Sequence, residues 1–285
     1  MRIVRKVFGA AAGLGFLLAS LSAWAAPATW RLGDGDTEIV LFGSMHALPK
    51  GAQWRTPELE AAIAAADEVW FEFPAPNAAG VSQAYAEAYK TMPKPPEKVS
   101  ALLSERAKEK AIEAFGSLAA VDSKRPTELI NELARRYWAG LGADLENGVE
   151  TTIQRQVPIE KQRAFGKPEQ HLKISVGAPV EDQIRELEVF LLGHHNPEPL
   201  RRATEAWLAG DMGYLHRESV ERMKHRSPGD YSRVVAERNV AWTEEIVRML
   251  DRPGKMLIVV GAGHMAGPEG LPALLRAKGL RVEGP

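Results

Sequence analysis

The chain contains no cysteine among its 285 residues. This absence excludes structural disulfides, a cysteine nucleophile and any metal site built on thiolates. It also excludes a bacterial-type lipid anchor on a cysteine after the apolar N-terminal segment. A metal ion bound here would have to use histidine, carboxylate or backbone oxygen, and the stability of the fold must come from its core.

An excess of positive charge is missing as well. Lys and Arg together number 36 and Asp and Glu 37, so the formal net charge at pH 7 is −1. Binding to nucleic acid, or to anionic membrane lipid, generally requires a basic excess or a polybasic patch. The composition therefore predicts no nucleic-acid partner and no electrostatic membrane attachment.

The apolar run at the N-terminus is shorter than a membrane-spanning helix. Basic residues near Met1 precede an apolar stretch over residues 7–21, whereas a spanning helix needs ~20 residues. Small residues follow at Ala23 and Ala25, so residues 1–25 are predicted to form a signal peptide that is removed. We expect a periplasmic or secreted protein with no stable membrane insertion after cleavage; the alternative is an uncleaved anchor.

The remaining residues, 26–285, are enough for a single domain with a substantial core. Glu38–Phe42 and Val69–Phe73 are short apolar runs, typical of buried strands. Between them, Pro57–Ala66 has helical spacing, with Thr56 as its N-cap. Strand, helix and strand in close succession indicate a parallel crossover unit.

The middle and the end of the chain differ in character. Residues 81–250 have almost no β-branched run and are predicted to be helical, with one candidate strand at His171–Val176. The chain then returns to α/β, with a strand at Lys255–Val260, a helix at Glu269–Lys278 and a terminal strand at Leu280–Glu283. The sequence thus predicts a sheet made by the two ends of the chain, with a large helical insert between them.

A small motif occurs twice, near opposite ends of the chain. Each time an apolar strand ends in Gly-x-x-His, first at Gly43 to His46 and again at Gly261 to His264. Ligands bind at the carboxyl ends of strands in parallel α/β sheets, and neutral imidazole is a common metal ligand. The repetition indicates that both histidines converge on one cation; the alternative is two loop histidines that hydrogen-bond to backbone.

Glu72 is the third candidate of the site. It lies within the apolar run Val69–Phe73, where a carboxylate is costly unless it is paired or bound to a metal. His46, His264 and Glu72 would make a three-ligand set with an open position for water. The alternative is an ion pair between Glu72 and an arginine of the core.

Arg238 and Asn239 interrupt the apolar stripe of the helix expected over residues 228–251. A charged side chain and an amide that face the core need partners, and Glu72 or a substrate anion would serve. The alternative is that one of the two extends to solvent. Other histidines, among them His171, lie in polar stretches and are expected at the surface.

These features together resemble the TraB/GumN family, which includes the Tiki proteases. The segments that carry the resemblance are Gly43–Pro49, Glu72 in its strand, Glu237–Trp242 and Val260–Leu271. They span nearly the whole mature chain in the family's order. One departure is the family's Gly-Leu-Glu segment in a middle strand, which is followed by a glutamine. The corresponding place here, Ile174–Gly177, has no glutamate.

The resemblance implies a fold like that of the erythromycin-esterase and ChaN group: an α/β fold whose central mixed sheet is formed by the N- and C-terminal segments, with a large helical insert. It also implies metal-dependent hydrolysis, with peptide cleavage as in the Tiki members. On this hypothesis His46 and His264 bind a divalent cation such as manganese or cobalt. Glu72 is a third ligand or the general base, Arg238 orients Glu72 or stabilises an oxyanion, and Asn239 supports it.

Two rival hypotheses stand beside this one. A non-catalytic protein of the ChaN-like type would capture metal or haem with the same histidines, and Glu72 would then be half of a structural ion pair. An inactive scaffold that sequesters a signalling peptide is the third. The hydrolase hypothesis expects a peptide or small-molecule substrate as partner, and the sequence alone does not define the oligomeric state.

Overall fold

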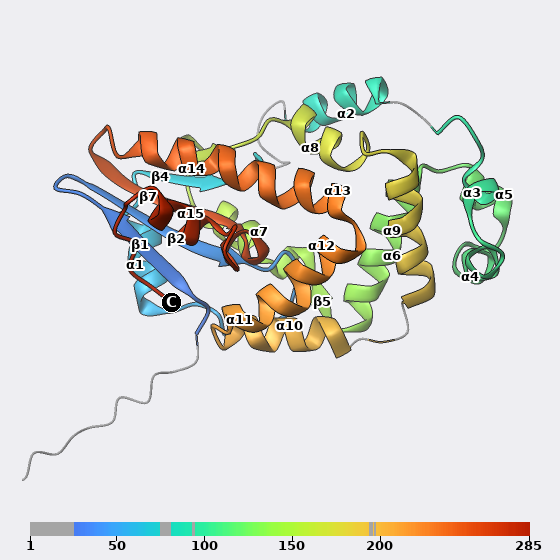
Figure 1. Ribbon diagram of the computed structural model, residues 1–285, viewed down its shortest axis with the longest axis horizontal. Coiled ribbons are helices and arrows are strands. Elements are labelled where there is room, and N and C mark those ends of the chain that lie inside the picture. Colours follow the sequence, from blue (N-terminus) through green and yellow to red (C-terminus); the bar gives the residue numbers. More distant parts are fainter. Residues whose placement is uncertain (1–25, 75–80, 93–94, 194–195, 197) are drawn as a thin grey trace, which may run out of the picture.

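The computed structural model describes residues 26–285 except 75–80, 93–94, 194–195 and 197. The predicted signal peptide, residues 1–25, lies outside the described residues. The molecule is elongated, with a sheet at one end and helices that extend from it towards the other (Figure 1). None of the helices among the described residues combines the length and the apolar character that membrane crossing requires.

The central sheet has five strands, in the order β1-β2-β7-β4-β6. The strands are β1 (Thr29–Gly33), β2 (Thr37–Ser44), β4 (Glu68–Phe71), β6 (Gln162–Ala164) and β7 (Gly254–Gly261). The outer strand β1 is antiparallel to β2, and the other neighbours are parallel. The prediction of a mixed sheet formed by the two ends of the chain is therefore confirmed. A second sheet pairs β3 (Leu48–Pro49) with β5 (Ala143–Asp144).

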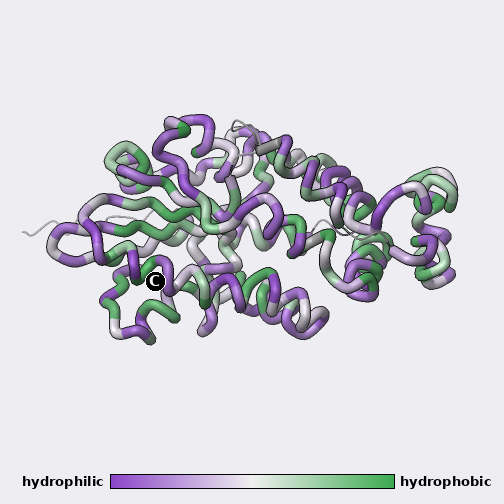
Figure 2. Tube along the Cα trace, turned by 90° about the horizontal axis from the view of Figure 1, so that it is seen from above, coloured by the Kyte–Doolittle hydropathy of each residue, from purple (hydrophilic) through white to green (hydrophobic). Residues whose placement is uncertain are grey.

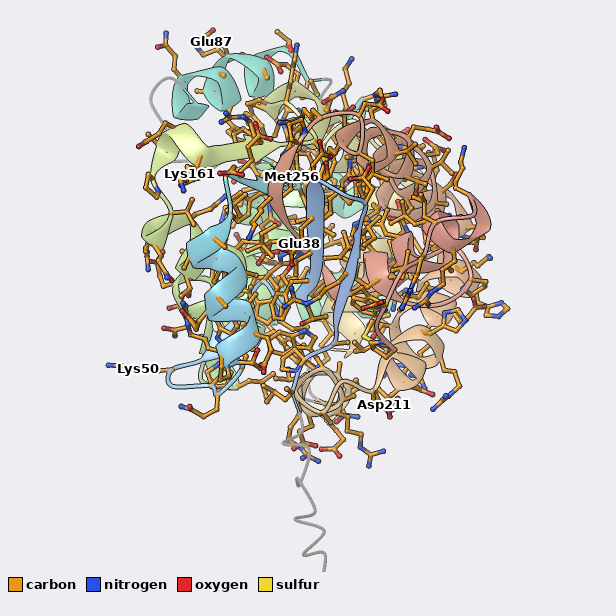
Figure 3. The ribbon with its side chains drawn as sticks, turned by 90° about the vertical axis from the view of Figure 1, so that its left-hand side faces the viewer. Glu38, Lys50, Glu87, Lys161, Asp211 and Met256 are labelled. Carbon is orange, nitrogen blue, oxygen red and sulfur yellow. The ribbon has the colours of Figure 1, made fainter. Side chains whose placement is uncertain are left out.

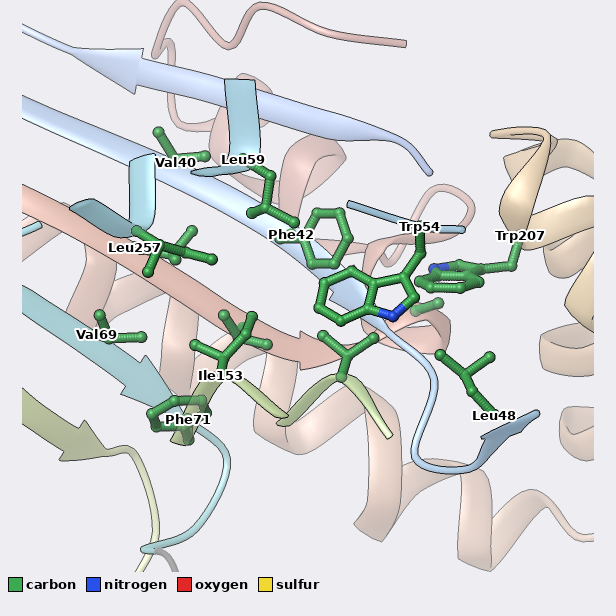
Figure 4. Close-up of a cluster of buried hydrophobic side chains, with 14 of the residues drawn as sticks. Val40, Phe42, Leu48, Trp54, Leu59, Val69, Phe71, Ile153, Trp207 and Leu257 are labelled. Atoms are coloured by element: carbon green, nitrogen blue, oxygen red, sulfur yellow. The ribbon is translucent and has the colours of Figure 1, made fainter. Parts of the chain in front are cut away.

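The central strands are buried on both faces because helices cover each side of the sheet. Phe42 and Leu257 point to the side of α1 (Pro57–Ala65) and α7 (Val149–Gln156), where they pack with Leu59 and Ile153 (Figure 4). The alternate residues of the same strands pack against α14 (Glu237–Met249) and α15 (Leu271–Ala277). Seen from the end, the sheet lies between α1 and these C-terminal helices (Figure 3). The strands are accordingly among the most hydrophobic segments of the chain (Figure 2).

The insert is mainly helical, as predicted. Its helices are α2 (Val81–Thr91), α3 (Val99–Leu102), α4 (Glu105–Phe115), α5 (Leu118–Asp122), α6 (Pro126–Gly140), α7, α8 (Pro168–Ser175), α9 (Val180–Gly193), α10 (Glu198–Leu208), α11 (Met212–Leu215), α12 (Arg222–Arg226), α13 (Pro228–Tyr231) and α14. Helices α3, α4, α5, α6 and α9 share a separate apolar core, distant from the sheet (Figure 1). Two π-helical segments, His216–Glu221 and Ser232–Ala236, precede α12 and α14.

Two expectations about strands were wrong, and two strands of the sheet were not predicted. His171–Val176 is not a strand, because Pro168–Ser175 forms helix α8 with Pro168 at its first position. The middle strand that joins the sheet is β6, which the sequence did not reveal because Gln162–Ala164 is short and polar. The terminal strand at Leu280–Glu283 is reduced to a single bridge between Glu283 and Arg31. Strand β1 was not anticipated at all.

Helix α14 provides a matched test of the core. Ile246 is fully buried against the sheet, whereas Val240 on the same helix is 57% exposed. Ile246→Ala is expected to lower the free energy of unfolding by ~2–5 kcal/mol through lost burial and a cavity. Val240→Ala should change it by less than ~0.5 kcal/mol. Urea unfolding measures both changes, provided that the dependence of the free energy of unfolding on urea concentration is the same in the wild type and the variants. Equal losses of stability in Ile246→Ala and Val240→Ala would contradict this packing.

Candidate functional site

The predicted site residues gather at the carboxyl edge of the parallel strands. His46 follows β2 by two residues, Glu72 comes directly after β4, and His264 lies in the 3-10 turn after β7. The register pairs Ser44 with Gly261, so the two Gly-x-x-His loops begin side by side. Because the carboxyl ends of parallel strands share one edge, residues from both ends of the chain meet there.

The two glycines of the repeated motif lie where the loops approach closely. A Cβ atom at Gly43 would be 3.1 Å from the backbone of the turn after β7, and one at Gly261 would be 3.1 Å from Oε1 of Glu72. The second point is also 3.6 Å from Nε2 of His46 and 3.7 Å from Cδ2 of His264. The two histidine rings and the carboxylate therefore surround the same small space beside Gly261.

A buried ion pair fixes Glu72. Its Oε2 accepts a hydrogen bond from Nη2 of Arg238 at 2.5 Å, and its Oε1 accepts one from the backbone N–H of Gly261 at 2.6 Å. The side chains of Glu72 and Arg238 are only 12% and 13% exposed. The guanidinium also lies over the rings of Phe73 and Trp242, 4.8 and 4.3 Å from their centroids. Glu72 thus has the arginine partner that the alternative interpretation expected.

The surroundings of Glu72 make it a poor base and a good ligand. Burial alone would raise its pKa, but the neighbouring histidines, the Arg238 guanidinium and the Gly261 N–H outweigh burial and lower it to about 2. A carboxylate with so low a pKa is a weak proton acceptor near pH 7. Its negative charge remains available to a cation, so the geometry favours the ligand role over the role of general base.

Asn239 holds His264 in one tautomer. Nδ2 of this fully buried amide donates to the carbonyl oxygens of His264 at 3.3 Å and Glu269 at 2.7 Å. Its Oδ1 must then face Nδ1 of His264, at 2.7 Å, so Nδ1 carries the proton. Burial lowers the pKa of His264 to about 4, and the ring is neutral at pH 7. Its unprotonated Nε2 lies 3.7 Å from Oε1 of Glu72 and 3.4 Å from Nη1 of Arg238.

His46 is held by a carboxylate that the sequence did not reveal. Oε1 of Glu150, in the first turn of α7, accepts a hydrogen bond from Nδ1 of His46 at 2.8 Å and another from the hydroxyl of Ser44. The negative charge of Glu150 raises the pKa of His46 to about 9. A cation that binds this ring must therefore displace a proton.

These side chains form a candidate metal site. One ligand atom from each of His46, Glu72 and Glu150 lies within 4.8 Å of the other two. Atoms that share one cation through bonds of ~2.0–2.2 Å are at most ~4.4 Å apart, so small side-chain movements would bring these three into range. This group of three shares His46 and Glu72 with the predicted ligands. The third predicted ligand, His264, has its Nε2 3.7 Å from Oε1 of Glu72, a distance that a shared cation would also allow.

A cavity of about 610 Å³ opens beside the site. The site residues His46, Glu72, Arg238 and His264 line it. Its other walls are mainly apolar and come largely from the helical insert; they include Met45, Ile130, Trp138, Ile174, Val189, Leu215, Met223 and Val234. Cavities of this size and character bind small molecules and short segments of chain.

The sequence analysis expected His171 at the surface, and this expectation was wrong. His171 lines the cavity. Its ring stacks on Phe73, with centroids 4.0 Å apart and planes 11° apart, and its Nδ1 is 2.8 Å from the hydroxyl of Tyr85. Burial and the charge of Arg238 lower its pKa. On α8, His171 and Ile174 line the cavity, whereas the polar neighbours Gln170 and Lys173 do not.

The hydrogen bonds of Asn239 predict a large effect of replacing its amide. Asn239→Leu removes the partners of the His264 Nδ1–H and of two carbonyl oxygens, at a cost of ~1–3 kcal/mol for each buried group left unpaired. We expect the free energy of unfolding to fall by at least ~3 kcal/mol. The nitrogen chemical shifts of His264 should show the Nδ1-protonated tautomer in the wild type and lose that preference in the variant.

Thr243→Val is the matched control on the same helix. The buried Thr243 hydroxyl donates to the backbone oxygen of Asn239, which has a helical partner as well. Its loss should cost less than ~1.5 kcal/mol and leave the His264 tautomer unchanged. A wild-type His264 protonated on Nε2 would contradict the arrangement described above.

Comparison with known proteins identifies the family. The sequence profile of the TraB/PrgY/gumN family matches residues 28–284, nearly the whole chain. Neither the curated proteins nor the solved structures gave a match. From the extent of the match and the order of its motifs, the chain belongs to the TraB/PrgY/gumN family.

Proposed function

We propose that this protein is an exported, metal-dependent hydrolase in which His46, His264 and Glu72 bind a divalent cation such as manganese or cobalt. The observation that carries the proposal is the meeting of the two Gly-x-x-His histidines beside one ionised carboxylate, on the wall of a cavity. Two imidazoles and a carboxylate with open positions are a ligand set for catalytic divalent metals. A bound cation would polarise a substrate carbonyl and lower the pKa of a water molecule.

The surrounding residues have separate tasks in this proposal. Asn239 keeps the proton of His264 on Nδ1, so that Nε2 is unprotonated and can bind a cation in place of the hydrogen bond that it accepts from Nη1 of Arg238. Arg238 orients the Glu72 carboxylate through Oε2, which leaves Oε1 turned towards the histidines. The same guanidinium lines the cavity, where its positive charge would stabilise an oxyanion.

The substrate is proposed to be a peptide or a small molecule with a hydrolysable carbonyl. The apolar walls of the cavity, including Ile130, Trp138 and Val189, suit apolar side chains or an acyl group on either side of that carbonyl. Export is proposed from the order of basic, apolar and small residues in 1–25. Mass spectrometry of the protein from intact cells should then give a mature chain that begins at Ala26.

A binding protein without turnover is the second candidate. The observation in its favour is that Arg238 already neutralises Glu72, as a structural ion pair would. In that case the site captures a metal ion or haem and releases no product. The two functions predict the same ligands and differ in whether a substrate is consumed.

Metal titration of the purified, chelator-treated protein tests the site. We expect tight binding of Mn²⁺ or Co²⁺ to the wild type, and an affinity lowered by more than ~100-fold in His46→Ala and in His264→Ala, since loss of an outer partner alone costs ~10–100-fold. His225→Ala is the matched control, because the side chain of His225 is 84% exposed. If the wild-type protein binds neither Mn²⁺ nor Co²⁺, the proposed metal site is wrong.

Turnover then separates the two candidates. The metal-loaded wild type is incubated with a peptide library and a set of activated esters, and His264→Ala and Glu72→Gln are assayed beside it. Hydrolysis that depends on metal and is abolished in both variants is the result expected of the hydrolase. Metal binding without any turnover, or a Soret band on addition of haem to the metal-free protein, would favour the binding protein.

A further inference from the structure

Glu150 is a partly buried acid in the site, and neither the motifs nor the family resemblance assigns it a role. Its side chain is 17% exposed, and α7 carries it to the sheet edge from the helical insert. The start of α7 is tied to the His46 loop, because the N–H of Val149 donates to the oxygen of Met45 at 3.0 Å. A Cβ atom at Gly148 would lie 2.0 Å from the carbonyl oxygen of His46. The helix start and the histidine loop therefore pack backbone against backbone.

The hydrogen bonds of Glu150 are directed at the ring of His46. Oε1 accepts from Nδ1 of His46 at 2.8 Å, and the hydroxyl of Ser44 donates to the same oxygen. The two nitrogens of an imidazole point in divergent directions, so a ring held at Nδ1 presents Nε2 elsewhere. Nε2 of His46 is turned to the space beside Gly261 that Oε1 of Glu72 also borders.

The same arrangement occurs at the second histidine. Oδ1 of Asn239 lies 2.7 Å from Nδ1 of His264, and Nε2 of that ring is turned to Oε1 of Glu72. Each histidine is thus held at Nδ1 by an oxygen from a helix, and each directs Nε2 to the same carboxylate. Outer oxygen acceptors of this kind fix the orientation of metal-binding histidines.

We infer that Glu150 is a positioning residue of the metal site: it holds Nδ1 of His46, with Ser44 as its second donor, so that His46 binds the cation through Nε2. The inference rests on the proposed metal site. Glu150 then has the role for His46 that Asn239 has for His264. Direct ligation by Glu150, whose oxygen lies within 4.8 Å of ligand atoms of His46 and Glu72, is the competing outcome of the test.

Co²⁺ is the probe, because its visible absorption reports the atoms that coordinate it. Metal-free wild type, Glu150→Ala, Glu150→Gln and Glu146→Gln are titrated with Co²⁺ alone. Glu150→Ala should bind Co²⁺ ~10–100-fold more weakly, as loss of an outer-sphere partner does. Glu150→Gln keeps an acceptor oxygen and should recover most of this affinity. Glu146, 67% exposed on the same segment, is the matched control and should have no effect.

The absorption of the Co²⁺-loaded protein separates positioning from ligation. If Glu150 only orients His46, the band positions are the same in the wild type, Glu150→Gln and saturated Glu150→Ala. A spectrum that changes in Glu150→Gln, with an affinity as low as that of Glu150→Ala, would show direct ligation and overturn the inference. Wild-type affinity in Glu150→Ala would overturn it too.

A second measurement on metal-free protein keeps this inference apart from the proposed function. Nitrogen-15 NMR should show a slowly exchanging Nδ1–H of His46 in the wild type and in Glu150→Gln, and its loss in Glu150→Ala. Absence of that signal from the wild type would contradict the hydrogen bond itself. If the signal is present but no Co²⁺ binds, the proposed metal site fails while the Glu150–His46 bond is upheld.

Discussion

The ionised carboxylate of Glu72 is the constraint on which this structure depends. A carboxylate this deeply enclosed is unfavourable on its own, and removal of either partner of a buried pair is strongly destabilising. Arg238 and the Gly261 N–H compensate for the burial, so one acid joins β4, β7 and α14 at a single point. The helix that provides Arg238 begins directly after the π-helical segment Ser232–Ala236. Wide turns of this kind are frequent at functional sites.

The fold was largely predictable wherever strands are apolar. The runs that became β2 and β7 are buried on both faces over most of their length, and such strands leave an unbroken hydrophobic signal in the sequence. In β4, buried Val69 and Phe71 alternate with partly buried residues, and its apolar run was still recognisable. Edge strands leave a weaker signal. Strand β6 has only three residues, two of them polar, and it pairs with the edge of β4. The apolar residues near Ile174 belong to a helix, since a short apolar run does not distinguish the two structures.

The site was predictable to the extent that its residues interrupt a pattern. Glu72 is a charged residue in an apolar run, and Arg238 and Asn239 are polar residues in an apolar helical stripe, so the sequence pattern alone marks each of them as a candidate. Glu150 interrupts nothing, because a short charged helix is an ordinary place for a glutamate. Only the packing of α7 against the His46 loop gives that residue its meaning, and this packing joins residues about a hundred positions apart along the chain.

The strand order has a consequence for how the chain assembles its candidate site. In the sheet, β7 lies between β2 and β4, although it is synthesised about 180 residues after β4. A growing chain therefore carries two apolar strands whose shared neighbour has not yet been made, and His264 is missing as well. A chain that ends before β7 cannot form the pocket, because Gly261 and His264 line it. Formation of the candidate site therefore depends on the last strand of the sheet to be synthesised, which must insert between two strands that are already made.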